Sequence, residues 1–221
     1  DLHGIRVLDE AFSQGYPDAH YLERRKNTLL VGIECLEPCD EHSFCKSMGT
    51  LTVSNGYDLH LTDLGDAYSV DVGSEAGRAL LKQFSEARQA TEADMKRMNK
   101  VLGAKWPRFP YKLEFDVGEL STLMAQSYEN PVWKKLADIC LACGQCTLVC
   151  PTCFCNTVDD NLSLDGTHAT RTRKWDSCVT LGFSYMHGLP MREGVDARYR
   201  QWLTHKLATW VDQFGELGCV G

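Results

Sequence analysis

The sequence predicts an α+β protein made of two domains, residues 1–115 and 116–221. Apolar residues alternate at period two across 59–72, which is typical of a hairpin, and helical apolar spacing follows after Ser74 and Thr91. Beyond residue 115 the helical stretches become short, and most of the cysteines follow. We therefore expect a small mixed domain followed by a cysteine-rich one.

The first domain opens with two short helices, because helical apolar spacing on either side is interrupted by Gly15-Tyr16-Pro17. An apolar run over 29–33 then predicts a short buried strand. A loop follows this strand and contains Cys35, Cys39 and Cys45.

The rest of the first domain carries turn and capping signals. The predicted hairpin reverses at Gly65-Asp66. Ser74 predicts the cap of one helix, and Thr91 with Asp94 three residues later predicts the start of another. The buried side of this last helix is expected to carry Met95, Met98 and Leu102.

The second domain begins with two short helical stretches, 119–126 and 131–137, which lead into a run of cysteines. After Cys155 the chain is first acidic and then basic. A last helix over 196–214 has a broad apolar face, formed by Tyr199, Trp202, Leu203, Leu207, Trp210 and Phe214. Core packing explains this face, and aromatic side chains beside a metal cluster would also shield it from water.

Most basic residues of the second domain are expected on solvated faces, with a docking surface as the alternative. They are Arg171, Arg173, Lys174, Arg192, Arg198, Arg200 and Lys206. The whole chain is acidic, with a net charge of −7, which disfavours general nucleic-acid binding. No apolar run is long enough to cross a bilayer. The first residues, Asp1-Leu2-His3-Gly4, have no basic flank or apolar stretch, so we expect no secretion signal. Because the first residue is not Met, we expect a piece of a longer protein.

Eleven cysteines are the unusual feature of the composition. Their odd number, their close spacing and the lack of a secretion signal favour metal ligands in a reducing, cytoplasmic setting over disulfides. The chain has no GxGxxG, P-loop or GxSxG motif and no histidine pair of metal-site spacing. We therefore expect no catalytic residue and no NAD, flavin or ATP site in this chain.

The most specific motif is Cys140-x2-Cys143-x2-Cys146-x3-Cys150-Pro151, a ferredoxin-type [4Fe–4S] ligand run. Two-residue spacers let three cysteines point toward one cluster, and in two-cluster ferredoxins the fourth binds the neighbouring cluster. We thus assign Cys140, Cys143 and Cys146 to a first cluster and Cys150 to a second. Four thiolates on one zinc ion are the main rival interpretation.

The chain ends Gly218-Cys219-Val220-Gly221, which resembles the start of a second cysteine run that is cut off. We interpret Cys219 as a ligand of the second cluster. The alternative is that Cys219 is an incidental thiol and that the four cysteines of the run hold one cluster. On the preferred interpretation the second domain is bacterial-ferredoxin-like, with two [4Fe–4S] clusters and a long insertion between its cysteine runs.

Six other cysteines have weaker assignments. Cys153, Cys155 and Cys178 either ligate another centre or pack as small apolar residues around the cluster loop, and Trp175-Asp176-Ser177-Cys178 could fold back over that loop. Cys35, Cys39 and Cys45 are one ligand short of a third [4Fe–4S] cluster, which a cysteine upstream of Asp1 would complete. A zinc site with His42 and the absence of any metal are the alternatives for this second group.

The order of these motifs resembles the beta subunits of cytoplasmic sulfhydrogenases, and the A subunit of anaerobic sulfite reductase is similar. The resemblance rests on Leu30-Val31-Gly32-Ile33 before Cys35, Phe44-Cys45-Lys46-Ser47-Met48-Gly49-Thr50, Gly56-Tyr57-Asp58-Leu59, Cys140-Leu141-Ala142-Cys143-Gly144, Cys150-Pro151-Thr152-Cys153-Phe154-Cys155, Trp175-Asp176-Ser177-Cys178, Tyr199-Arg200 and His205-Lys206-Leu207. One departure is Ser43-Phe44-Cys45, where some members have Cys-Phe-Cys; Cys39 is the substitute within this chain.

This resemblance implies a 4Fe–4S dicluster subunit within a soluble hetero-oligomer. Such a subunit would relay electrons between a flavin subunit that acts on NAD(P)H and a catalytic subunit of hydrogenase or sulfur/sulfite reductase type. A subunit that itself contacts sulfite or sulfur is the first alternative, and a zinc-stapled structural module is the second. Clusters held by thiolates alone leave no open site for substrate, which favours electron transfer.

Overall fold

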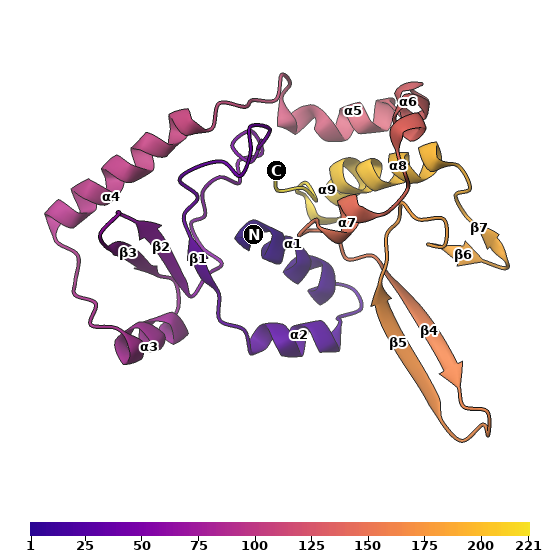
Figure 1. The fold of residues 1–221 in the computed structure, drawn as a ribbon, viewed down its shortest axis with the longest axis horizontal. Coiled ribbons are helices and arrows are strands. Elements are labelled where there is room, and N and C mark those ends of the chain that lie inside the picture. Colours follow the sequence, from indigo (N-terminus) through magenta and orange to yellow (C-terminus); the bar gives the residue numbers. More distant parts are fainter. The chain divides into compact units, whose positions relative to one another are not determined.

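The chain divides into two units in the computed structural model, which describes residues 1–221 (Figure 1). The first unit comprises Asp1–Val117 together with Val220–Gly221, and the second comprises Gly118–Cys219. Both helices and strands occur, so the predicted α+β class is confirmed. No helix is both long and apolar enough to cross a membrane.

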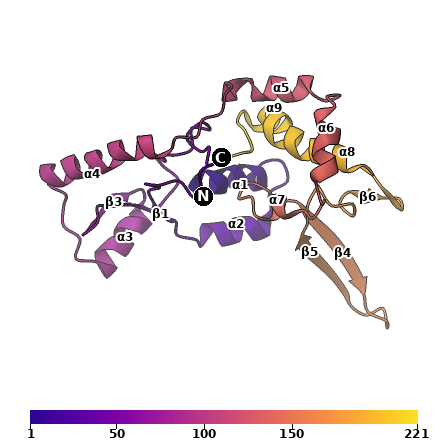
Figure 2. The same ribbon diagram turned by 45° about the horizontal axis from the view of Figure 1, so that its top comes forward.

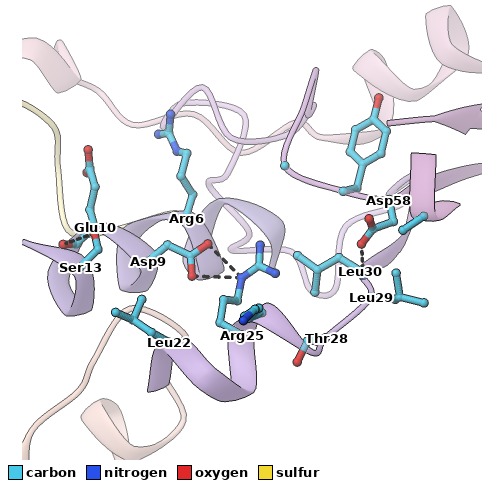
Figure 3. Close-up of a pocket in the computed structure, with 14 residues that line it drawn as sticks. Arg6, Asp9, Glu10, Ser13, Leu22, Arg25, Thr28, Leu29, Leu30 and Asp58 are labelled. Carbon is cyan, nitrogen blue, oxygen red and sulfur yellow. Dashed lines mark hydrogen bonds and ion pairs between the residues drawn. The ribbon is translucent and has the colours of Figure 1, made fainter. Parts of the chain in front are cut away.

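The first unit begins with α1 (Leu2–Ser13) and α2 (Ala19–Lys26), as the turn signal between them predicts. Asp18 caps α2 by accepting a hydrogen bond from the Tyr21 N–H at 2.9 Å. Arg25 of α2 forms an ion pair with Asp9 of α1 at 3.0 Å, and Figure 3 shows this pair in a pocket of about 740 Å³ that both charged and apolar residues line. The two charges of this pair therefore compensate each other within the pocket.

A three-stranded sheet of order β1-β2-β3 follows, with β1 (Val31–Ile33) parallel to β2 (Leu59–Asp63) and β3 (Tyr68–Val72) antiparallel to it. The β2–β3 hairpin is the predicted one. A strand is present within 29–33 as predicted, but its predicted burial is wrong, because Val31 and Ile33 are 52% and 60% exposed. β1 is one of the two edge strands of the sheet, and an apolar run does not reveal the position of a strand in its sheet.

Asp58 joins the sheet to the next helix, α3 (Glu75–Phe84). Its carboxylate accepts the Leu30 N–H at 2.7 Å and the Ser74 hydroxyl at 2.5 Å (Figure 3 shows the bond to Leu30). Ser74 in turn caps α3 by accepting from the Gly77 N–H at 3.0 Å. These bonds lower the pKa of Asp58, the hydroxyl of Ser74 having the largest effect.

Helix α4 (Glu92–Lys105) begins with the predicted capping box, in which the side chains of Thr91 and Asp94 each accept a hydrogen bond from the backbone N–H of the other residue. Its predicted buried side is only partly correct, because Met95 is 42% exposed whereas Lys105 is fully buried. Two 3₁₀ turns lie farther along the chain, at Trp106–Arg108 and Val117–Glu119.

The second unit packs helices around Trp133 and Trp210, which are 3% and 1% exposed. Short helices α5 (Leu120–Gln126) and α6 (Val132–Ile139) precede the cysteine run, close to the predicted bounds, and α7 (Gln145–Leu148) lies within it. A small hairpin of β6 (Tyr185–Met186) and β7 (Leu189–Pro190) leads to the C-terminal helices.

The predicted last helix is continuous over 195–214 but changes type in the middle. It consists of α8 (Val195–Thr204), a π-helical turn over His205–Thr209, and α9 (Trp210–Phe214). The expectation that its basic residues are solvated is wrong for Arg198 and Lys206, each 5% exposed. Arg198 is buried because its guanidinium donates to the carbonyls of Val179 at 2.8 Å and Glu193 at 2.6 Å.

Strands β4 (Asn156–Leu162) and β5 (Ala169–Trp175) form an antiparallel hairpin with seven residues in each strand. It extends away from the helices of its own unit in both Figure 1 and Figure 2. Every residue of β5 is exposed, and Asp160 forms an ion pair with Arg171 across the two strands. The hairpin thus joins the rest of its unit only at its base, which lies next to Cys155 and Asp176 in the chain.

Candidate iron–sulfur centre

The loop from Cys140 to Cys146 has a backbone shape that suits a metal cluster. Helix α6 ends before Cys140, and two loop residues, Ala142 and Gly144, have positive φ angles of 51° and 78°. This turn directs the Ala142 N–H toward the Cys140 sulfur at 3.4 Å. Backbone N–H groups that point at cluster sulfurs are a main way in which proteins tune iron–sulfur potentials.

The three thiols of this loop influence one another electrostatically. Burial raises the pKa of Cys146, and the neighbouring Cys140 and Cys143 raise it further. Tyr199 of α8 lies beside the same group, since burial raises its pKa and negative charge on Cys146 and Cys140 adds to the effect. Free thiols held at this spacing fit the thiolate set that an iron–sulfur cluster requires.

The segment Trp175–Cys178 packs on this loop, as the sequence suggested. Gly144 is the contact point: a Cβ atom there would lie 2.8 Å from Ser177 Cβ. The Asp176 carboxylate holds the segment by accepting the Ser177 N–H at 2.7 Å and hydroxyls of Thr180 and Thr157. The backbone N–H of Asp176 donates to the Cys155 carbonyl at 3.0 Å. The loop therefore requires glycine at 144 both for its φ angle and for this close approach.

Cys150 and the residue before Cys219 are joined through the side chain of Thr152. The Thr152 hydroxyl donates to the Gly218 carbonyl at 2.7 Å and lies 3.2 Å from the Cys150 sulfur. Thr152 is 3% exposed, so these contacts are shielded from water. The structure thus brings the Cys150 turn and the Cys219 segment together, although they are far apart in sequence.

Lys206 completes this junction from the π-helical turn. Its ammonium donates to the Gly218 carbonyl at 2.7 Å and also to the Thr152 hydroxyl. A hydrogen bond from Cys153 and then the charge of Lys206 lower the pKa of Cys150 to about 4, against the opposing effect of burial. The positive charge of Lys206 thus favours the thiolate of Cys150, the form in which cysteine binds iron.

Cys155 and Cys178 form a second close pair of thiols. A hydrogen bond from Cys178 lowers the pKa of Cys155 to about 7, while the pKa of Cys178 is raised. Cys153 interacts electrostatically with both. The ring of Phe154, which lies between Cys153 and Cys155 in the sequence, is 5.6 Å from the ring of Trp210. The aromatic face of the last helix therefore lies against this segment.

The N-terminal cysteines share one loop after β1. Burial raises the pKa of Cys35, and the charges of Cys39 and Cys45 add to the effect. Nowhere in the chain do three His, Cys, Asp or Glu side chains converge tightly enough to hold a single ion. His42, the alternative zinc ligand, is 73% exposed and its ring lies 5.8 Å from that of Tyr111.

A buried ionic group fixes the start of this N-terminal loop. Glu34 binds the ammonium of Lys105 through one carboxylate oxygen, and its other oxygen lies 3.6 Å from His60 Nε2. The side chains of Lys105, Glu34 and His60 are 1%, 7% and 9% exposed. The residue preceding Cys35 is therefore anchored in the core of the first unit.

Sequence reasoning missed Lys206, Thr152 and the Glu34 group. Lys206 did carry a signal, because it lies three residues after Leu203 and four before Trp210, on the apolar face of its helix. A charged residue at such a position is either solvated at an edge or buried with a partner, and spacing alone does not decide between them.

The Cys140–Cys146 loop combines ferredoxin-type cysteine spacing with an N–H···S bond, an arrangement typical of iron–sulfur proteins. Comparison with known families agrees, since residues 139–221 match the 4Fe–4S dicluster domain. The chain is similar to "Sulfhydrogenase 2 subunit beta" of Pyrococcus furiosus, with 37% identity over 190 residues. This alignment covers 86% of the chain and 54% of that relative. No solved structure matches.

Proposed function

We propose that this chain is an electron-transfer subunit of a soluble, cytoplasmic redox complex of sulfhydrogenase type. It would relay electrons between a flavin subunit acting on NAD(P)H and a catalytic subunit of hydrogenase or sulfur/sulfite reductase type. The observation that supports this most is the Cys140–Cys146 loop, whose thiols, positive φ angles and N–H···S bond suit a [4Fe–4S] cluster. A cluster of this kind accepts and releases single electrons and leaves the binding of substrate to other subunits.

Two clusters are proposed within the second unit. Cys140, Cys143 and Cys146 would hold the first, and Cys150 and Cys219 would each supply one ligand to the second. The junction of Thr152 with Gly218 supports this division, because it keeps the backbone beside Cys219 close to Cys150. The hairpin and the C-terminal helices would then form a long insertion between the two cysteine runs.

The first experiment is an iron and acid-labile sulfide count on anaerobically purified protein, with EPR of the dithionite-reduced state. We expect a brown protein with about four irons per cluster and a signal from the reduced clusters. Stoichiometric zinc in place of iron would contradict the proposed function and favour a structural module. A cluster with a non-cysteine ligand would instead favour a subunit that contacts sulfite or sulfur.

The second experiment tests the division of ligands. Cys143→Ala should remove mainly the first cluster, and Cys150→Ala mainly the second, so each variant should lose the iron of about one cluster, and a different EPR signal should survive in each. The same signal surviving in both variants would show that these cysteines hold one cluster, and Cys219 would then lose its proposed role.

A further inference from the structure

Lys206 is a buried cation without an anionic side chain bonded to it. It is 5% exposed, and its ammonium donates to two neutral acceptors, the Gly218 carbonyl at 2.7 Å and the Thr152 hydroxyl. Burying an ammonium is costly unless a negative charge compensates it, and neutral acceptors do so only in part. The buried lysine therefore requires a nearby anion.

The hydrogen bonds of Lys206 point to that anion. The Thr152 hydroxyl, to which the ammonium donates, lies 3.2 Å from the Cys150 sulfur, so the nearest group that becomes anionic on binding iron is the Cys150 thiol. The ion pairs of Arg171 with Asp160 and of Lys174 with Asp159 belong to the hairpin and do not involve Lys206.

The position of the ammonium is equally specific. Thr152 lies two residues after Cys150, and Gly218 immediately precedes Cys219. The hydrogen bonds of Lys206 thus fix its charge at the junction of the two segments that carry the proposed ligands of the second cluster. The π-helical turn that presents Lys206 is itself a rare conformation that often marks functional sites.

We propose that Lys206 is the internal counter-charge of the iron–sulfur cluster bound by Cys150 and Cys219, and that it raises the reduction potential of this cluster. The inference rests on the proposed function. A cluster held by thiolates is anionic, and reduction adds one more negative charge to it. A fixed cation nearby stabilises the reduced state more than the oxidised state, and water does not screen it because the site is buried.

The test is an EPR-monitored redox titration of the full chain with its clusters. Lys206→Met removes the charge and keeps an unbranched side chain, and Lys206→Arg keeps the charge. Lys134→Met is the matched control, because Lys134 is an exposed lysine of the same unit. Thr152→Val removes the bridging hydroxyl and leaves the charge in place.

We expect Lys206→Met to make reduction of one cluster about tenfold less favourable, a fall of about 59 mV for one electron. The other cluster should shift less. Lys134→Met should leave both potentials unchanged, and Lys206→Arg and Thr152→Val should stay closer to the wild type than Lys206→Met. Iron-replete Lys206→Met with wild-type potentials would overturn the inference and leave the proposed function intact.

Iron content decides the remaining outcomes. If Lys206→Met loses one cluster, retention of that cluster by Lys206→Arg shows that the charge is required there. Loss of the cluster in both variants means that Lys206 only shapes the core, and the inference is then wrong. Wild-type protein without iron would refute the proposed function itself, before any variant is compared.

Discussion

Replacing Gly144 by alanine tests how closely the segment around Ser177 covers the cysteine loop. Gly144 has a φ angle of 78°, and an added Cβ would lie 2.8 Å from Ser177 Cβ and 3.2 Å from Thr180 Cγ2. The left-handed backbone costs an alanine about 1–2 kcal/mol. Overpacking against a closed contact adds about 1–3 kcal/mol. The sum predicts that Gly144→Ala lowers the free energy of unfolding by about 2–5 kcal/mol.

Gly215→Ala is the control for this experiment, because Gly215 has a φ angle of 74° but no atom within 4 Å of its added Cβ. It should show only the backbone cost. Urea unfolding followed by circular dichroism, with iron content measured in parallel, gives both values. Gly144→Ala should destabilise the protein more than Gly215→Ala does. In the double variant with Ser177→Gly this difference should shrink by a coupling energy of about 0.5–3 kcal/mol. Equal destabilisation by Gly144→Ala and Gly215→Ala would refute the close packing of this segment on the loop.

Three further predictions concern the first unit. Glu34→Gln should destabilise the protein by about 3–5 kcal/mol in urea unfolding, because it leaves the buried Lys105 ammonium unpaired, whereas the exposed Glu92→Gln should change stability by less than about 0.5 kcal/mol. Cys45→Ser should lower the iron content by about one cluster if the N-terminal thiols hold one, and unchanged iron would assign them a structural role. Because the pKa of Asp58 is lower in the folded than in the unfolded protein, its carboxylate stabilises the fold above about pH 3.9, and this stabilisation is lost as the pH falls through the pKa of the folded state. The difference in free energy of unfolding between wild type and Asp58→Asn should therefore shrink in acid. A difference that does not depend on pH would contradict this.

Helix caps and other local features could be predicted from the sequence, because one short segment determines them. Ser74 and Thr91 cap helices as expected, because a capping side chain and the N–H it accepts from are only three residues apart. The proposed pairing of Cys150 with Cys219 followed from ligand spacing alone, and the Thr152–Gly218 hydrogen bond now supplies a structural reason for it.

Features that depend on distant parts of the chain were not readable. The apolar run around Val31 was expected to be buried, but only the order of the strands decides which strand lies at an edge. Lys206 and Arg198 were expected in solvent, because sequence gives their charge and not the carbonyl oxygens that a folded loop offers them. Buried charge is a property of tertiary contacts, and periodicity reports only the face on which a residue lies.

The β4–β5 hairpin determines where the second unit unfolds locally and where it accepts cleavage or insertion. An unsupported two-stranded hairpin is only marginally stable in water, so its amide protons should exchange early and its turn at 163–168 should be the first site of proteolytic cleavage. Its root is fastened separately, by the Asp176 N–H on the Cys155 carbonyl and by the Thr157–Asp176 hydrogen bond. The far end can therefore fray, be cut or receive a fused tag while the root keeps Cys155 beside Cys178, which makes the hairpin tip the natural place to attach a probe.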